Sequence, residues 1–271
     1  MSQNIKQLRG RIKSIDSTLH LTKAMGLVAS SKIRKATETM QKSLEYSEAF
    51  RETVKLLAGC HECKASPYMA PRKEGVTCLV VIAGDRGLAG GYNANVFRLL
   101  REYPEARIIP IGKRACERFR EPILSAEHFS YRQARELAER LCREFTQGEI
   151  ARVGILGTRY RSLMSQEPYV RLLLPLEAEA EKEARGYTAI FEPDEMTVLN
   201  AMVPDYLAST ILSCVRESFA SEVAARRVAM DNAEKNAREM IDTLQLEYNR
   251  ARQSSITQEI TEIVAGSGSE L

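Results

Sequence analysis

Proline and glycine are nearly absent from both ends of this 271-residue chain. All nine prolines lie between Pro67 and Pro204, and neither proline nor glycine interrupts the stretch from Asp205 to Ala265. Because both residue types commonly end helices, their absence predicts long helices at the two termini. At about 1.5 Å of rise per residue, a helix over the C-terminal stretch would be roughly 90 Å long, several times the width of a domain this chain could build. Part of that helix must project or pair with another.

The chain also has little net charge, no tryptophan and few histidines. A net charge of only +3 argues against a protein that coats nucleic acid. The six cysteines are scattered, and we find neither a signal peptide nor an apolar run long enough to cross a bilayer. We therefore expect free thiols in a reducing, cytoplasmic-side location. With 44% hydrophobic residues, the composition suits one medium globular domain plus extended helix.

Two stripes of small and apolar residues predict coiled-coil seams near the termini. With no proline before Pro67, we expect the N-terminal helix to extend toward Leu57. Gly26 within the first stripe costs roughly 1 kcal/mol of helix propensity, which close contact between helices would explain. The C-terminal stripe is rich in alanine and serine and would bury little apolar surface, so an outer partner is implied. The N-terminal stripe is Ile5, Leu8, Ile12, Ile15, Leu19, Thr22, Gly26, Ala29, Ile33, Ala36 and Met40, and the C-terminal stripe is Met230, Ala233, Ala237, Ile241, Leu244, Tyr248, Ala251 and Ser255.

Charge is unevenly distributed between these segments. Ser2 to Lys42 holds nine Lys or Arg against two acidic residues, whereas Asp205 to Ala265 holds ten acidic and seven basic residues. This complementarity indicates that the two helices could pair with each other. The basic run Ser30 to Ala36 could touch phosphates, but it lies on a heptad helix with almost no aromatic residues to stack on bases. We favour a solvated or protein-facing surface for it.

Between the terminal helices, strand-like runs alternate with helical stretches. This alternation is typical of right-handed crossovers and a mainly parallel, doubly wound α/β sheet. The charged stretch Glu177 to Arg185 is expected to be a solvated, mobile connection. Strands are predicted over Val76 to Ala83, Arg107 to Ile111, Arg152 to Leu156 and Tyr169 to Leu174, and helices over Ala94 to Glu102, Arg114 to Arg120 and Tyr131 to Phe145.

A glycine-rich segment, GDRGLAGGYN from Gly84 to Asn93, follows the first strand and opens a helix. Glycines in this position can bring backbone N–H groups toward a phosphate. The segment lacks both the GxGxxG order and the GK[ST] of a P-loop. We therefore favour a tight strand-to-helix turn or docking loop over a nucleotide site, in a sheet that looks like a Rossmann fold without its ligand.

No catalytic or metal-binding constellation stands out. The CHEC segment, Cys60 to Cys63, could hold zinc, but no second cysteine pair or histidine cluster lies at a useful interval, so a loop coincidence is favoured. The histidines His20, His61 and His128 have no recognisable triad companions. We predict no catalytic residue, no metal site and no cofactor for this chain.

The two ends and the glycine-rich segment together resemble the gamma subunit of F-type ATP synthases. The matching stretches are LTKAMGLVASSKIRKA from Leu21 to Ala36, the C-terminal run from Val228 to Gly266, GDRGLAGGYN, and MSQEPYVRLLLP from Met164 to Pro175. The resemblance covers essentially the whole chain. It implies an antiparallel coiled coil of the terminal helices plus a Rossmann-like doubly wound α/β domain. The implied domains are 1–58, 59–204 and 205–271.

The resemblance also implies partners and contacts. The chain would be a non-catalytic shaft inside a 3:3 ring of alpha and beta subunits, with its base against epsilon and the c-ring, so that any membrane contact is indirect. Proton-driven rotation would couple to ATP synthesis or hydrolysis in the ring, at the cytoplasmic face of a bacterial inner membrane. The implied contacts to the ring are Lys23, Met25, Arg252, Gln253 and Thr257, and those to the c-ring are Phe191, Glu192, Pro193 and Asp194.

Two positions depart from the family's pattern. Gly26 stands where a larger side chain is more frequent, and Ala89 replaces a frequent cysteine. The redox-regulatory insertion of the chloroplast members is absent, so thiol switching is not expected. Two other classes of function stay open. A coiled-coil adaptor outside the ATP synthase would need no ring contacts, and a nucleotide-dependent enzyme would bind ATP or NAD at the glycine-rich turn.

Overall fold

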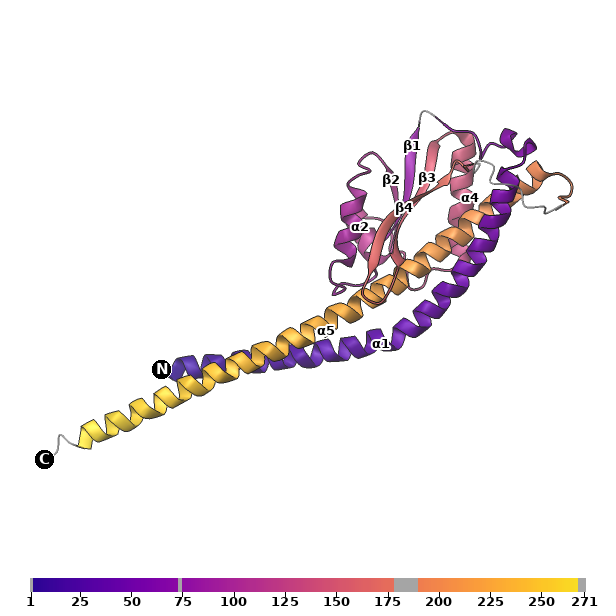
Figure 1. Cartoon of the computed structure of the whole chain (residues 1–271). Helices are drawn as coiled ribbons and strands as arrows, with labels where there is room; N and C mark the ends of the chain where they lie inside the picture. Colours follow the sequence, from indigo (N-terminus) through magenta and orange to yellow (C-terminus); the bar gives the residue numbers. More distant parts are fainter. Residues whose placement is uncertain (1, 73–74, 178–189, 268–271) are drawn as a thin grey trace. The chain divides into compact units, whose positions relative to one another are not determined.

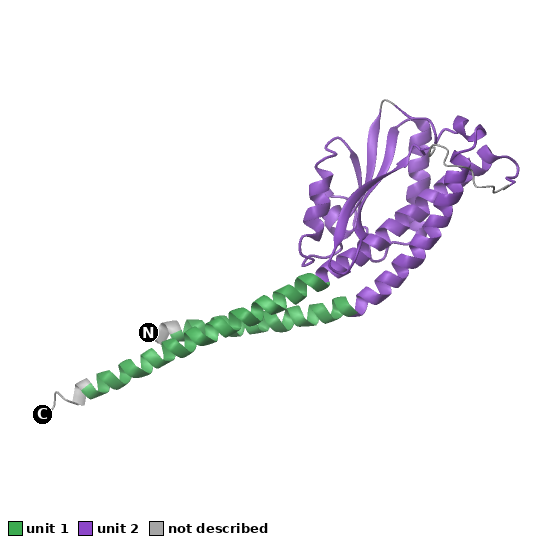
Figure 2. Ribbon diagram, in the orientation of Figure 1, with its two compact units in different colours: residues 1–30, 227–271 green, residues 31–226 purple. Residues whose placement is uncertain are grey.

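The computed structural model describes residues 2–72, 75–177 and 190–267 of the chain (Figure 1). The chain divides into two compact units, coloured separately in Figure 2. We call residues 1–30 and 227–271 the helical unit, and residues 31–226 the α/β unit. The predicted connection from Glu177 to Arg185 lies, from residue 178 onward, outside the described residues.

Two very long helices dominate the chain, as predicted. Helix α1 spans Ser2–Ala58 and helix α5 spans Glu195–Ser267. Every position of the N-terminal stripe is buried or half-buried, and so is every position of the C-terminal stripe. The three- and four-residue spacing of the stripes therefore correctly identified the faces on which these helices pack.

Helix α5 begins earlier than the proline pattern predicts. It starts at Glu195 instead of after Pro204, which lies inside the helix. A proline inside a helix costs about 3 kcal/mol. Leu199, Val203 and Leu207, on either side of it, are completely buried, and their packing offsets this cost.

Among the residues that the structure describes, the α/β unit contains a four-stranded sheet in the order β2-β1-β3-β4. Strands β1, β2 and β3 are parallel, as expected from the alternation of strands and helices. Strand β4 instead pairs antiparallel with β3, because only a short turn joins the two strands and a parallel pairing would need a long crossover. The strands are β1 Val76–Ile82, β2 Arg107–Ile111, β3 Ile150–Tyr160 and β4 Gln166–Leu174, and the helices between them are α2 Tyr92–Leu100, α3 Lys113–Phe119 and α4 Tyr131–Gln147.

Helices cover both faces of this sheet (Figure 1). Alternate residues of β1 point to opposite faces. Cys78, Val80 and Ile82 belong to a core shared with α4 and with the α/β-unit portions of α1 and α5. Leu79 and Val81 belong to a second core beneath α2 and α3. The fold class predicted from the sequence, two long helices with a doubly wound α/β domain, is confirmed.

One apolar segment of α5 was missed in the sequence. The helix contains an 18-residue window with a mean hydropathy of 1.4, long and apolar enough to cross a membrane. However, 61% of this window is buried inside the fold. Burial of this kind is typical of a core helix, which needs apolar residues on most sides when it packs against a sheet and other helices.

Candidate functional site

The glycine-rich loop lies where a doubly wound fold would bind a ligand. It follows β1, whose two neighbours, β2 and β3, continue the sheet in opposite directions. Ligands of such folds bind at the carboxyl ends of the strands, where the strand order reverses. The loop that was predicted to be a turn or docking loop therefore lies where a bound ligand would be expected in this fold.

A carboxylate of the chain itself occupies this loop. The backbone N–H groups of Asp85 and Arg86 donate to the two carboxylate oxygens of Glu222 on α5, each at 3.2 Å. Arg226, one turn further along α5, pairs with the same carboxylate at 2.5 Å and donates to the carbonyl of Gly87 at 3.3 Å. Only 1% of Glu222 is exposed. The loop thus docks on α5 and uses the N–H groups that a phosphate would require.

The rest of the glycine-rich segment supports the same contact. A Cβ at Gly84 would lie 2.8 Å from Cδ of Glu222, so the close approach requires glycine. The amide oxygen of Asn93 accepts from Gly84 N at 2.9 Å. The hydroxyl of Tyr92 donates to the carbonyl of Ser218 on α5 at 2.9 Å. Glycine, asparagine and tyrosine in this motif therefore serve the attachment of the loop to α5.

Asp85 holds the neighbouring loops together. Its carboxylate accepts hydrogen bonds from the N–H groups of Lys113, Ala126 and Glu127 and from Ser125 Oγ, at 2.6 to 3.0 Å. Burial alone would raise the pKa of the Asp85 carboxyl. The four hydrogen bonds outweigh burial and hold that pKa below its ordinary value. The ends of β1 and β2 are thereby joined through one buried anion.

Helix α1 contacts the same cluster of loops. Lys32 pairs with Glu127 at 2.5 Å, and Arg86 approaches the other oxygen of Glu127 at 3.7 Å. Arg34, by contrast, forms an exposed pair with Glu38. The basic run, predicted to be either solvated or protein-facing, thus contains one residue of each kind.

The CHEC segment shows no metal geometry. Among the described residues, no group of three or more His, Cys, Asp or Glu could hold a metal ion. Cys63 is fully buried at the start of a short 3-10 helix, Glu62–Ala65, and Cys60 is partly exposed. Burial raises the pKa of the Cys63 thiol to about 11, which disfavours the thiolate that a metal requires.

The residues predicted to contact a catalytic ring lie in the helical unit. Lys23 is exposed and Met25 is half-buried beside the seam. Arg252, Gln253 and Thr257 are exposed. The two groups are not brought together: a Cβ at Gly26 would meet Met230, and Arg252 lies roughly 33 Å further along α5 at the ordinary helical rise. They form two separate surfaces, and their contacts stay predictions.

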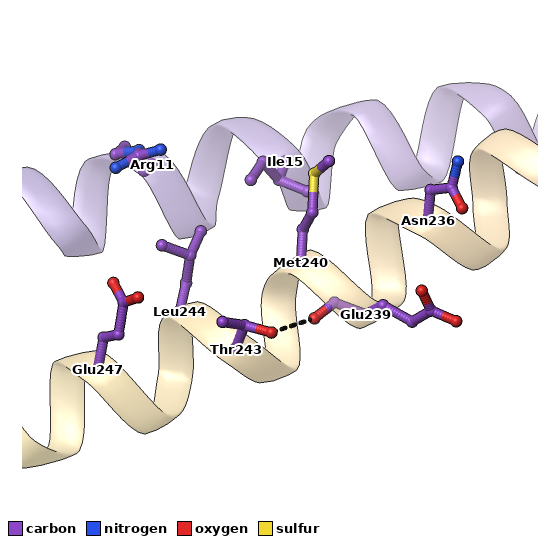
Figure 3. A pocket seen from close by; sticks show the side chains of 8 residues that line it. All are labelled: Arg11, Ile15, Asn236, Glu239, Met240, Thr243, Leu244 and Glu247. Carbon is purple, nitrogen blue, oxygen red and sulfur yellow. Dashed lines mark hydrogen bonds between the residues drawn. The ribbon is translucent and has the colours of Figure 1, made fainter.

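The helices of this unit run antiparallel. Gly26 of α1 faces Arg227 and Met230 of α5, whereas Arg11 and Ile15 line a groove with Leu244 and Glu247. The groove has a volume of about 450 Å³. Figure 3 shows the seam residues Ile15 and Leu244 between the two ribbons, with charged side chains around them. The groove combines apolar side chains with charged ones, and this mixture suits protein contact better than catalysis. The residues that line it are Arg11, Ile15, Asn236, Glu239, Met240, Thr243, Leu244 and Glu247.

A second apolar surface near the end of α5 was not predicted from the sequence. Ile256, Ile260 and Ile263 lie three or four residues apart and are 44%, 56% and 71% exposed. Leu21 and Leu27 on α1 are also more than half exposed. The signal was available, because isoleucines at this spacing make a helical stripe of their own. Exposed apolar residues at this density indicate a surface that other protein covers.

The segment predicted to face a c-ring immediately precedes helix α5. Asp194 accepts hydrogen bonds from the N–H and the hydroxyl of Thr197, both at 2.8 Å. The bond from the Thr197 N–H is the main reason that the pKa of Asp194 is lowered. Phe191 packs against the core, whereas Glu192 and Pro193 are exposed. Helix capping and packing thus explain Asp194 and Phe191, while the contact role of all four residues stays a prediction.

Gly26 offers a test of how close the helices are. A Cβ there would lie 3.6 Å from Met230 Cβ and 3.2 Å from Nη1 of Arg227. We expect Gly26→Ala to stabilise the helical unit by up to about 1 kcal/mol through helix propensity, and Gly26→Leu to destabilise it by about 1–3 kcal/mol through overpacking. Thermal unfolding of both variants, followed by circular dichroism, measures this. A destabilised Gly26→Ala variant would contradict the distance between the two helices at this position.

Comparison with known proteins places this architecture in a family. The family model described as ATP synthase matches residues 4–269. The ATP synthase gamma chains of Moorella thermoacetica and Ruminococcus albus are each 39% identical to this chain, and each alignment covers 97% of this chain and 98% of the relative. A chain in the rotor of the Euglena gracilis mitochondrial ATP synthase has the same fold, with a TM-score of 0.67 at 19% identity, covering 94% of this chain and 100% of that one. This chain therefore belongs to the ATP synthase gamma-chain family.

Proposed function

We infer that this chain works as the central-stalk rotor subunit of an F-type ATP synthase. Membership of the gamma-chain family gives it that non-catalytic role. The observation that carries the role in this structure is the helical unit itself, a pair of antiparallel helices with a buried seam and apolar residues on the outside. A shaft enclosed by other subunits needs such a surface. An adaptor outside the ATP synthase is not favoured.

The nucleotide-dependent enzyme is also disfavoured, by one specific contact. Glu222 places a carboxylate against the N–H groups of Asp85 and Arg86, and a nucleotide phosphate would have to displace it. Two negative charges cannot share that site without a large energetic cost. Nucleotides would instead bind to the subunits around the shaft.

Rotation would act on those subunits by differential contact. An asymmetric shaft touches three surrounding catalytic sites differently, so each step shifts the balance between their open and closed states. We propose that Lys23 and Met25 contact one level of the ring, and that Arg252, Gln253 and Thr257 contact another. Exposed arginine is suited to bidentate, charge-assisted contact with acidic residues of a partner.

The base of the rotor would meet epsilon and the c-ring. We propose Phe191, Glu192, Pro193 and Asp194 as the segment near the c-ring, with Glu192 and Pro193 exposed for contact. The functional division would follow residues 1–58, 59–204 and 205–271. The complex would lie at the cytoplasmic face of a bacterial inner membrane, with this chain held there only through its partners.

Reconstitution tests the rotor function. Purified alpha and beta subunits would be assayed for ATPase activity with and without this chain, and a bead attached to the α/β unit would report rotation. We expect activation and stepwise rotation during hydrolysis. Binding to the ring without activation or rotation would leave the adaptor interpretation instead.

Arg252→Ala tests the proposed contact near the end of α5. We expect turnover of the reconstituted complex to fall about tenfold, which corresponds to about 1.5 kcal/mol for a lost hydrogen bond to a charged group. Arg250→Ala is the matched control, because Arg250 is also exposed but lies on another side of the helix. Equal losses in the two variants would contradict a specific role for Arg252.

A further inference from the structure

The docking of the glycine-rich loop on α5 has the composition of an anion-binding site. Two backbone N–H groups, those of Asp85 and Arg86, converge on one carboxylate, and the guanidinium of Arg226 supplies the positive charge. Only 11% of the Arg226 side chain and 1% of the Glu222 side chain are exposed. Phosphate sites in the loop between a first strand and the helix that follows it combine the same elements.

The partners of this site are far apart in the sequence. Glu222 is 137 residues from Asp85, and Arg226 is 139 residues from Gly87. Because both carboxylate oxygens and the guanidinium are satisfied together, the loop cannot move along α5 without leaving buried charges unpaired. The contact is therefore specific in position.

We propose that the loop Gly84–Asn93 is an anion-binding site whose ligand is the chain's own Glu222, and that this internal ligand fixes the sheet to the rotor helix α5. Glu222 is then a positioning residue, and Arg226 holds its carboxylate in place. The consequence for torque, that the sheet and α5 turn together under load, rests on the proposed rotor function.

Removal of the internal ligand should leave an empty site that a small carboxylate can fill. In Glu222→Ala, the N–H groups of Asp85 and Arg86 and the guanidinium of Arg226 would remain, with space where the carboxylate was. We expect exchange of the loop amides with deuterium, measured by mass spectrometry on the full-length chain, to accelerate on the order of tenfold to a hundredfold. Excess formate should slow the exchange again, whereas sodium chloride at equal ionic strength should do so much less.

Two variants control this experiment. Glu234→Ala removes a carboxylate from the same helix that forms a surface pair with Arg238, and should change neither loop exchange nor its response to formate. Glu222→Gln keeps the side-chain shape and one acceptor oxygen, so it should fold with intermediate exchange rates and little response to formate. Unchanged exchange in Glu222→Ala, or faster exchange that formate does not reverse, would overturn the proposal of an internal ligand.

The torque consequence is measured separately, in the reconstituted complex with alpha and beta subunits. We expect beads attached to the α/β unit to stall at lower load with Glu222→Ala than with the wild-type chain, and formate to restore part of the difference. Wild-type torque in a variant whose loop amides exchange faster would overturn the positioning role. If the wild-type chain itself fails to rotate, the rotor function fails, while the exchange result still decides whether Glu222 is the ligand.

Discussion

Replacing Gly112 with alanine is expected to destabilise the α/β unit severely. Gly112 links β2 to α3 with φ of +92°, and an added Cβ would lie 1.9 Å from the carbonyl oxygen of Ala83. That oxygen belongs to backbone that cannot easily withdraw, because Ala83 N donates to Ile111 O at 2.9 Å. Gly112 N is itself bonded to Leu124 O at 2.8 Å. The substitution therefore combines backbone strain with a clash that no side-chain motion relieves.

The expected loss is more than about 4 kcal/mol, a large part of the stability of an ordinary domain. Denaturant unfolding followed by circular dichroism measures it, together with the yield of soluble protein. Gly10→Ala is the matched control, since Gly10 is an exposed residue of α1 with no atom within 4 Å of its added Cβ. That variant should be as stable as the wild type or slightly more stable. Similar unfolding midpoints for Gly112→Ala and the wild type would contradict the geometry of this turn.

Loss of the Asp85 carboxylate is expected to have the second largest effect. Asp85→Ala would leave the N–H groups of Lys113, Ala126 and Glu127 without their acceptor in a mostly buried site. We expect a loss of about 3–5 kcal/mol in the free energy of unfolding, as for other buried charges with hydrogen-bonded partners. Asp85→Asn should lose less, because its amide oxygen can still accept two of these bonds.

The pH dependence of the unfolding free energy shows whether the Asp85 carboxylate causes this loss. The folded-state pKa of Asp85 lies below its unfolded value, so its contribution to stability is fully present above the unfolded pKa of about 4 and is lost as the pH falls through the folded pKa. The difference in unfolding free energy between the wild type and Asp85→Asn should therefore shrink below about pH 4. Burial raises the pKa of Glu217, so its contribution to the pH dependence of stability has the opposite sign. This contribution is the same in both proteins and cancels in the difference. A difference independent of pH would contradict the role of the charge.

Local patterns were sufficient for the helices and for part of the sheet. The heptad spacing from Ile5 to Met40 identified the buried face of α1, since a helical stripe depends only on neighbours three and four residues apart. The antiparallel pairing of β4 could not be derived from the alternation of elements, although the short turn between Tyr160 and Gln166 favours it. The proline rule failed at Pro204 because packing against the core outweighed a local preference.

The candidate site, too, could be predicted only in part from the sequence. The glycine-rich segment was predicted to be a tight turn or a docking loop because it lacks the motifs of a nucleotide site, but its partner was not predictable, because Glu222 looks like any acidic residue on a long helix. The exposed isoleucines from Ile256 to Ile263 were visible as a stripe and were overlooked. The proposed ring contacts Lys23 and Arg252 came from resemblance, since an exposed cation carries no signal of its own.

The two long helices, their seams and the alternation of strands and helices could be predicted from the sequence, because each depends on residues close together along the chain. Where α5 begins, how β4 pairs and which carboxylate fills the loop after β1 could be learned only from the folded chain. These features depend on contacts such as that between Asp85 and Glu222, 137 residues apart. Local propensities cannot specify such a contact, since its energy arises only when burial, hydrogen bonds and charge are assembled together.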